Sequence, residues 1–308
     1  MRDVFFIVGP TATGKSEIAA DVARGLNAEI VGADAFQIYR GLDLLSAKPD
    51  AATLAIVRHH LIGTMSILEE TNAEKFRKLA LQAISQIHSR GKLAIVVGGS
   101  GLYLKALTHG LGCAPASDPD LRARLSESSL EELREKLIAL DPDAAQKVDV
   151  KNRRRVTRAL EICLLSGKPA SRQRREWSEG ETPTTTGIFV FRERDELYER
   201  INRRVETMFE RGVIEEVRAP GAMSETASKM IGLREIRDLL DGPATAESIL
   251  QCVSAIQQAT RRYAKRQLTW FRRQTNFESL NLTLLSHVEA VERISQFAKT
   301  LEVAQGND

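Results

Sequence analysis

A glycine-rich loop near the amino terminus constrains this chain more than any other feature of its sequence. Residues 9–16 read GPTATGKS and fit the pattern G-x-x-x-x-G-K-[ST] in full. The apolar run Val4–Val8 precedes the loop, and a helical pattern from Lys15 to about Leu26 follows it. This strand–loop–helix context is the one that the pattern requires. The loop is therefore predicted to bind a di- or triphosphate.

Each part of the loop has a physical task in holding phosphate. Glycines let backbone N–H groups approach an anion, and the positive end of the following helix favours its negative charge. Lys15 adds a mobile positive charge, and the Ser16 hydroxyl is placed to ligate Mg²⁺. The predicted phosphate-binding residues are Gly9, Pro10, Thr11, Ala12, Thr13, Gly14, Lys15 and Ser16.

The first 110 residues alternate short apolar runs with helical patterns. The runs Val4–Val8, Ala28–Gly32 and Leu93–Val97 are wholly apolar or nearly so, which is typical of parallel strands covered on both faces. Ligands of such sheets bind beyond the carboxyl ends of the strands. We therefore expect the loop, Asp34 and Ser100 to converge on one cleft.

Beyond about Leu111 the sequence reads as helical, with Asp118-Pro119 as a start signal and Gly167 as a stop signal. A turn at 182–186 and an apolar strand at Gly187–Phe191 then lead back to the sheet. Further helices are expected at 195–218, 226–241, 244–275 and 285–301. The predicted fold class is α/β, a P-loop NTPase-like parallel sheet flanked by helices. Residues 1–115 and 188–308 are expected to form this core, and 116–187 a mainly helical insertion.

Charge is concentrated in two segments of the chain. Residues 151–175 carry a formal charge of +8 and residues 258–273 carry +6, whereas the whole chain carries +3, so the remainder sums to −11. A single basic run is usually a solvated helix face. Two such segments in an otherwise acidic chain, beside a phosphate loop, favour a polyanionic partner such as nucleic acid.

Composition narrows the class of protein further. The three cysteines are widely separated, which favours neither a disulfide framework nor a zinc site. No apolar stretch reaches the length of a signal peptide core or a membrane span. We therefore expect a cytoplasmic protein with no membrane contact that acts as a monomer.

The strand ends depart from those of ordinary P-loop NTPases. Such proteins hold their Mg²⁺ shell with an Asp at the end of an apolar strand, but the run at 93–97 ends in glycines and Ser100. Asp34 is the one acid that follows a strand nearby. It fits a turn residue or a carboxylate in the cleft acting on a proton or on the metal, and the sheet geometry favours the second.

Stretches along nearly the whole chain resemble bacterial tRNA dimethylallyltransferases, the IPP transferase family. They are the loop itself, DAFQIYRGLDLLSAKP (34–49), HHLI (59–62), GGSGLYLKAL (98–107), RRVTRALEICLLSGKP (154–169), ERINRRVETMFERGVIEEV (199–217), IGLREI (231–236) and RRYAKRQLTWFRR (261–273). The family transfers a dimethylallyl group from dimethylallyl diphosphate to N6 of the adenosine on the 3′ side of the anticodon in tRNA.

The resemblance implies roles for particular residues. The loop and Lys15 would hold the donor diphosphate as a leaving group, with Mg²⁺ as the cofactor. Asp34 would take the proton of the acceptor amine, and Ser100 would bond the oxygen that bridges carbon and diphosphate. By the same resemblance, Arg204 would be a further residue that clamps the diphosphate, and its neighbour Arg203 is the alternative.

The resemblance also implies contacts with tRNA, the expected macromolecular partner. Asp34, Ala35, Phe36, Gln37 and Ser100 would read the target base and its neighbours. The remaining contacts would be Arg122, Arg154, Arg155 and Arg158 on the insertion and Arg262, Lys265 and Arg266 near the carboxyl end. Trp270 is expected to pack in the core with the apolar face of its helix, although a base-stacking role is conceivable.

Departures from the family pattern leave details of base recognition open. Ala35, Ser46, Asn152 and Leu233 replace residues that are common in the family. The alternatives are a P-loop kinase of a small metabolite or nucleoside, with ATP in the loop and Asp34 as base, and an RNA-binding NTPase. The basic segments disfavour the first, and the lack of a strand ending in Asp-Glu disfavours the second.

Overall fold

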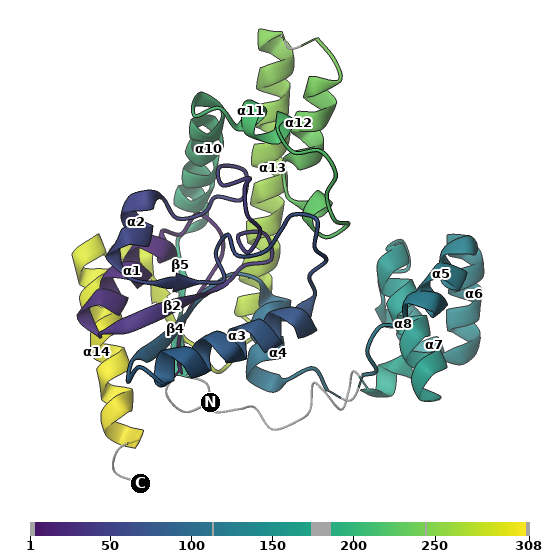
Figure 1. The fold of residues 1–308 in the computed structure, drawn as a ribbon, viewed down its shortest axis with the longest axis horizontal. Helices are drawn as coiled ribbons and strands as arrows, with labels where there is room; N and C mark the ends of the chain where they lie inside the picture. Colours follow the sequence, from purple (N-terminus) through teal and green to yellow (C-terminus); the bar gives the residue numbers. More distant parts are fainter. Residues whose placement is uncertain (1–3, 113, 174–185, 244, 306–308) are drawn as a thin grey trace. The chain divides into compact units, whose positions relative to one another are not determined.

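The structure, a computed structural model, describes residues 4–112, 114–173, 186–243 and 245–305 (Figure 1). The chain forms two compact units. Residues 1–108 and 184–308 form one, and residues 109–183 form the other. The first unit contains the sheet and the second is helical.

The first unit is built on a six-stranded sheet in which every neighbouring pair is parallel. The strand order is β3-β2-β4-β1-β5-β6. The strands are β1 (Val4–Val8), β2 (Ala28–Ala33), β3 (His59–His60), β4 (Leu93–Gly98), β5 (Thr186–Phe191) and β6 (Glu278–Asn281). The predicted α/β fold with a parallel sheet and flanking helices is confirmed.

The two faces of the sheet bury separate apolar cores because strand side chains alternate between faces. Phe5 and Ile7 of β1 pack with buried residues of helices α1 (Lys15–Gly25) and α14 (His287–Gln305). Val4, Phe6 and Val8 face the opposite core, which includes Phe76 of α3 (Ala73–His88). Helices therefore cover both faces, as Figure 1 shows for α1 and α14 on one side and α3 on the other.

Six further helices and two 3₁₀ turns complete the described part of this unit. They are α2 (Ala51–Ile56), α4 (Gly101–His109), α10 (Arg194–Glu210), α11 (Val213–Arg218), α12 (Leu233–Leu240) and α13 (Ala246–Phe271), with 3₁₀ turns at Ala227–Lys229 and Leu282–Leu284. Helix α4 runs one residue into the second unit.

Glycines interrupt two of the expected long helices. The predicted helix 195–218 is two helices, because Gly212 takes a left-handed conformation with φ of 89° between α10 and α11. Residues 226–241 contain a 3₁₀ turn and the short helix α12, which begins after Gly232 with φ of 91°. L side chains rarely adopt such angles, so these glycines end one helix and start another.

The second unit is a helical bundle in which side chains cap the helix starts. It contains α5 (Pro119–Glu127), α6 (Leu130–Leu140), α7 (Pro142–Lys147) and α8 (Arg153–Ser166). Asp118, Ser129, Asp141 and Asn152 accept backbone N–H groups at these starts, as the sequence predicts for Asp118. Most of the expected turn at 182–186 lies outside the described residues. Across the described ranges, no helix combines the length and apolar character needed to span a bilayer.

Candidate active site

The site lies where four parallel strands end. β1 leads into the glycine-rich loop, β2 into Asp34, β4 into Gly99 and Ser100, and β5 into Arg192. The backbone N–H of Gly9 donates to Gly98 O at 3.2 Å, which ties the loop to the end of β4. A Cβ on Gly9 would lie 2.2 Å from Val190 O of β5, so only glycine fits between these strands. The expected convergence of loop and strand ends is present.

The loop is held open by left-handed residues and by internal hydrogen bonds. Ala12 and Gly14 have φ of 65° and 88°. The Thr13 hydroxyl donates to Pro10 O at 3.0 Å, and Lys15 Nζ donates to the same oxygen at 3.1 Å. Gly14 immediately precedes α1, so the positive end of this helix faces the loop. The arrangement is that of an anion-binding cradle.

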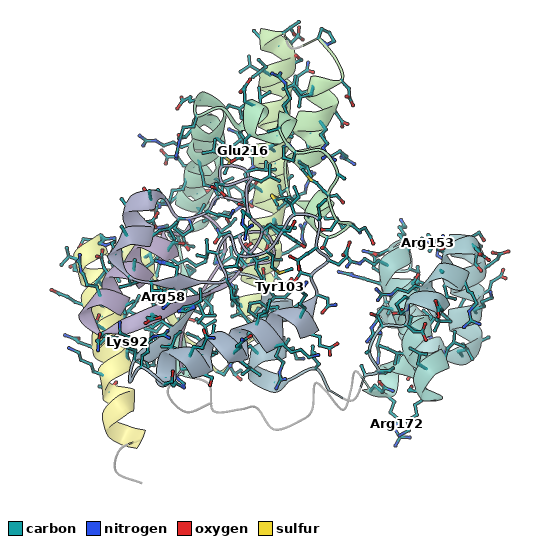
Figure 2. All side chains as sticks on the ribbon, in the orientation of Figure 1. Arg58, Lys92, Tyr103, Arg153, Arg172 and Glu216 are labelled. Atoms are coloured by element: carbon teal, nitrogen blue, oxygen red, sulfur yellow. The ribbon has the colours of Figure 1, made fainter. Side chains whose placement is uncertain are left out.

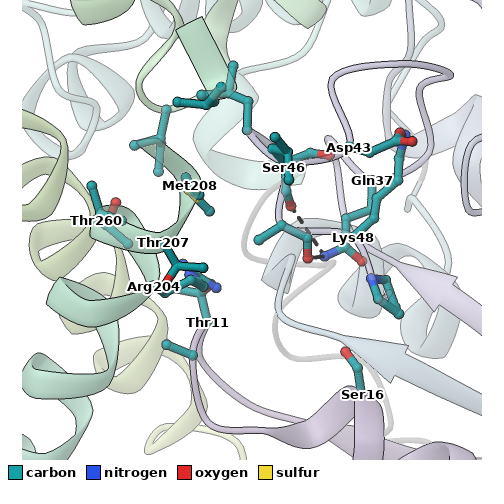
Figure 3. Close-up of a pocket in the computed structure, with 18 of the residues that line it drawn as sticks. Thr11, Ser16, Gln37, Asp43, Ser46, Lys48, Arg204, Thr207, Met208 and Thr260 are labelled. Carbon is teal, nitrogen blue, oxygen red and sulfur yellow. Dashed lines mark hydrogen bonds and ion pairs between the residues drawn. The ribbon is translucent and has the colours of Figure 1, made fainter. Parts of the chain in front are cut away.

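Three arginines hold consecutive residues of the loop. Arg204 Nη1 donates to Thr11 Oγ1 at 2.9 Å, Arg200 Nε to Ala12 O at 2.8 Å, and Arg192 Nε to Thr13 O at 2.9 Å. Arg200 and Arg204 lie one turn apart on α10, and Figure 3 shows Arg204 beside Thr11. Arg200 and Arg192 were not singled out from the sequence, because a bond to a backbone carbonyl leaves no residue pattern.

Positive charge at the loop is desolvated. Burial lowers the pKa of Lys15 to about 8, although the nearby Asp34 carboxylate opposes that shift. Burial likewise lowers the pKa of Arg204 to about 10, and its Nε has no hydrogen-bond partner among the described residues. Arg203 is exposed. Arg204 therefore carries an unsatisfied buried donor next to the loop, whereas its neighbour does not.

Asp34 forms the turn that follows β2 and also lines the cavity. Its Oδ1 accepts the backbone N–H of Phe36 at 2.9 Å and of Gln37 at 3.3 Å. Ser100 Oγ accepts the N–H of Ala35 at 3.0 Å, so the β4 end fixes this turn. The turn position considered for Asp34 is therefore present, and the residue also lines the cavity. Its action on a proton or on a metal stays a prediction.

A cavity of about 950 Å³ opens above the loop. Loop residues, Asp34, Phe36, Gln37, the segment 43–51 and side chains of α10 and α13 line it. Gln37 Nε2 donates to Ala47 O at 2.7 Å, on the side of the cavity away from Arg204 (Figure 3). The cavity therefore joins the anion cradle to a wall of mixed polar and apolar groups.

Helix α13 contributes two further residues that sequence reasoning did not assign. Gln267 is buried; its Oε1 accepts Thr11 N at 3.0 Å and its Nε2 donates to Gly99 O at 2.9 Å, so it bridges the loop and the β4 end. Tyr263 lines the cavity. Burial and the Asp34 carboxylate raise the pKa of Tyr263, and the nearby Ser100 hydroxyl opposes this rise. Both lie within a block that resembles the family, which was their only signal.

Trp270 packs where the apolar face of its helix predicts. A Cβ on Gly101 would lie 2.7 Å from the Trp270 ring, which also meets Phe271 edge-on. Arg262, Lys265 and Arg266 are exposed on α13. The helix ends at Phe271, four residues before its predicted end at 275, with Arg272 at its C-cap.

Some basic residues of the helical unit form hydrogen bonds within that unit, and others are exposed to solvent. Arg122 binds the buried carboxylate of Glu161 through Nε at 2.6 Å and Nη2 at 3.1 Å. Arg158 binds Glu161 at 3.2 Å and Pro115 O at 2.6 Å. Arg154 and Arg155 are exposed, and Arg155 lies 3.9 Å from Asp149. Arg122 and Arg158 thus also stabilise this unit.

The residues at the loop are suited to Mg²⁺ that is bound mainly by the phosphate groups of a ligand and by few protein oxygens. Ser16 lines the cavity (Figure 3), and its hydroxyl makes no protein hydrogen bond within the described ranges. No cluster of three His, Cys, Asp or Glu residues with metal-binding geometry occurs among the described residues. Mg²⁺ is commonly bound by one or two protein oxygens together with phosphate and water, which matches this donor set.

Fold and site together define a P-loop protein whose cradle opens into a cavity larger than a diphosphate needs. The family model described as IPP transferase matches residues 37–274. The tRNA dimethylallyltransferase of Akkermansia muciniphila is 43% identical over 269 residues, which cover 87% of this chain and 90% of that protein. The chain belongs to the IPP transferase family.

Solved structures agree with this placement. The tRNA isopentenylpyrophosphate transferase of Bacillus halodurans is similar over 99% of both chains, with a TM-score of 0.72 and 35% identity. A eukaryotic dimethylallyltransferase, captured acting on tRNA, has a TM-score of 0.79 and 26% identity, covering 94% of this chain and 77% of that one. The family resemblance expected from the sequence is confirmed.

Proposed function

We propose that this protein is a tRNA dimethylallyltransferase, which transfers the dimethylallyl group of dimethylallyl diphosphate to N6 of the adenosine 3′ of the anticodon. The observation that carries the proposal is the junction of the anion cradle with a large cavity at Asp34. A carboxylate there lies between a diphosphate site and a space for an acceptor base.

On the donor side, the allylic C–O bond breaks and the electron pair leaves with the diphosphate. Negative charge grows on the leaving group, where Lys15, the loop N–H groups and Arg204 stabilise it. The unsatisfied Nε of Arg204 supports its role as the clamp in preference to the exposed Arg203. Ser16 would hold Mg²⁺, which supplies further charge neutralisation to the diphosphate when bound.

On the acceptor side, a C–N bond forms at the exocyclic amine and one amine proton is lost. An adenine amine is a poor nucleophile, so a carboxylate that takes its proton assists the step. We assign this role to Asp34, which lines the cavity. Ser100 and Tyr263 lie beside it, and the Ser100 hydroxyl is available to bond the bridging oxygen.

The RNA would reach this cavity with its target base unstacked. Residues 34–37 would contact the base, and Arg262, Lys265 and Arg266 would contact phosphates. Residues 116–187, the proposed insertion domain, would contact the RNA through Arg122, Arg154, Arg155 and Arg158. The exposed positions of Arg154 and Arg155 support this more directly than those of Arg122 and Arg158, which also bind Glu161.

A mass measurement on RNA tests the proposal. An adenosine-flanked anticodon stem-loop is incubated with the protein, Mg²⁺ and dimethylallyl diphosphate, and a parallel sample receives ATP in place of the donor. We expect one prenyl group on one adenosine in the first sample and no change in the second. Consumption of ATP without prenyl transfer would support the small-molecule kinase instead.

A further inference from the structure

The cavity wall opposite the loop is a compact turn of seven residues, Leu42–Lys48. Ser46 N donates to Leu42 O, Ala47 N to Leu44 O and Lys48 N to Asp43 O, each at 3.0 Å. Leu42 and Ala47 have φ of 52° and 51°. Left-handed conformations are costly for residues with a Cβ, so this turn persists only where its surroundings fix it.

One side chain supplies the partners that the turn cannot provide itself. Glu216 of α11, labelled in Figure 2, lies in the sheet-containing unit. It accepts Leu44 N through Oε1 and Leu45 N through Oε2, both at 2.9 Å. These bonds join segments more than 170 positions apart in the sequence. Val213 and Val217 anchor α11 in the core, so the carboxylate is offered from a fixed element.

The turn 42–48 also fixes the position of Gln37, a residue expected to contact the acceptor base of the RNA. Gln37 Nε2 donates to Ala47 O at 2.7 Å and to Ser46 O at 3.4 Å. The loop 9–16 has its own supports, Arg192, Arg200, Arg204 and Gln267, and none of these bonds residues 42–48. The two sides of the cavity are therefore braced separately.

We propose that Glu216 is a positioning residue for the acceptor: it holds the turn 42–48, and through it Gln37, in the geometry that receives the RNA base. This rests on the proposed function. The consequence is selective, because loss of Glu216 weakens the use of RNA while leaving the use of the prenyl donor intact.

The adjacent glutamate offers a matched control. Glu215 is exposed and lies 3.8 Å from the exposed Arg218, so it braces nothing in the cavity. The Michaelis constants for an anticodon stem-loop and for dimethylallyl diphosphate are measured for Glu216→Ala, Glu216→Gln, Glu215→Ala and Glu215→Gln, each substrate being varied with the other saturating.

We expect Glu216→Ala to raise the KM for RNA about tenfold, since two charge-assisted bonds are lost, and to leave the KM for the donor and kcat within about twofold. Glu216→Gln retains one acceptor oxygen and should fall between the alanine variant and the wild type. Should Glu216→Ala not fold, Glu216→Gln against Glu215→Gln carries the comparison. Both Glu215 variants should match the wild type.

Hydrogen exchange gives a readout that does not depend on activity. Amides of residues 42–48 should exchange faster in the Glu216 variants, while those of the loop 9–16 stay unchanged. Equal KM values in the Glu216 and Glu215 variants, or equal rises in both KM values, would overturn the inference. A wild-type protein that transfers no prenyl group would instead overturn the proposed function.

Discussion

Arg204 of α10 donates a hydrogen bond from Nη1 to the hydroxyl of Thr11 at 2.9 Å, across 193 positions of sequence. The bond joins the carboxyl-terminal part of the core to its first loop. Because the Arg204 Nε is buried and has no partner in the described part of the chain, the guanidinium keeps donor capacity beside the phosphate cradle. A bound diphosphate would satisfy it.

Substitution of Arg204 tests this relationship. Arg204→Ala should lower kcat/KM for dimethylallyl diphosphate about a hundredfold, since it removes a donor aimed at developing charge. Arg204→Lys should recover only part, because an ammonium lacks the planar fork. Steady-state kinetics of Arg203→Ala, measured alongside, decide which of the two arginines is the clamp. The kcat/KM of Arg203→Ala for dimethylallyl diphosphate should differ from the wild-type value by no more than about threefold. A larger loss for Arg203→Ala would make Arg203 the clamp.

The lowered pKa of Lys15 predicts a pH dependence. Burial holds this pKa at about 8 in the free protein, so Lys15 is charged below that pH and neutral above it. The charged form favours the diphosphate, and kcat/KM for the donor should therefore fall as pH rises through about 8. Lys15→Arg keeps its charge, so its activity, although lower, should lack this fall. An identical fall in both proteins would assign it to another group.

The proposed contacts of Lys265 and Arg266 with RNA phosphates can be tested by measuring how the binding affinity depends on salt concentration. Replacing both Lys265 and Arg266 by Gln should weaken stem-loop binding and reduce the slope of log K against log salt by about 1 per contact removed. Binding titrations between low and moderate salt measure this. Lys78→Gln, an exposed lysine of α3 paired with Glu74, should leave the slope unchanged. Equal slopes for the double variant and the wild type would exclude this face of α13 from the RNA interface.

A buried carboxylate away from the site predicts how stability depends on acid. Glu29 of β2 is bonded by Arg90 at 2.7 and 3.1 Å and by His60 at 2.7 Å. Bonds from Arg90, followed by those from His60, lower the pKa of Glu29 to about 2 against the opposing cost of burial. A carboxyl group whose pKa is lower in the folded than in the unfolded protein stabilises the fold at pH values above its unfolded-state pKa. This stabilisation is lost as the pH falls towards the folded-state pKa.

Glu29→Gln should therefore lower the free energy of unfolding by about 3 kcal/mol at pH 7, since it leaves partly buried cations without their counter-charge. The difference from the wild type should shrink between pH 4.5 and about 2. Denaturant unfolding at several pH values measures it. A difference that stays constant down to pH 3 would contradict this assignment.

The central strands were predictable because their chemistry is local. β1 and β4 are continuous apolar runs, β2 is apolar apart from Glu29, and the loop after β1 has a complete pattern. β3 and β6 were missed because they are short edge strands, His59–His60 and Glu278–Asn281, without apolar periodicity. They are strands because they pair with a neighbouring strand, and their own residues carry no sign of that pairing.

The site was partly predictable for the same reason. Loop residues, Asp34 and Ser100 follow strand ends, so topology alone brings them together. Gln267, Arg200 and Glu216 instead bind backbone atoms of distant segments. A backbone partner carries no residue identity, and only the folded structure shows that these side chains reach it.

The most direct test of this account is the single-turnover rate of prenyl transfer by Asp34→Asn. Asparagine can still accept the N–H groups of Phe36 and Gln37 and so keep the turn, but it cannot take the amine proton. We predict a loss of about a thousandfold in the rate, with binding of the stem-loop and of the donor within about threefold of the wild type. A rate within tenfold of the wild type, at equal binding, would contradict the role given to Asp34.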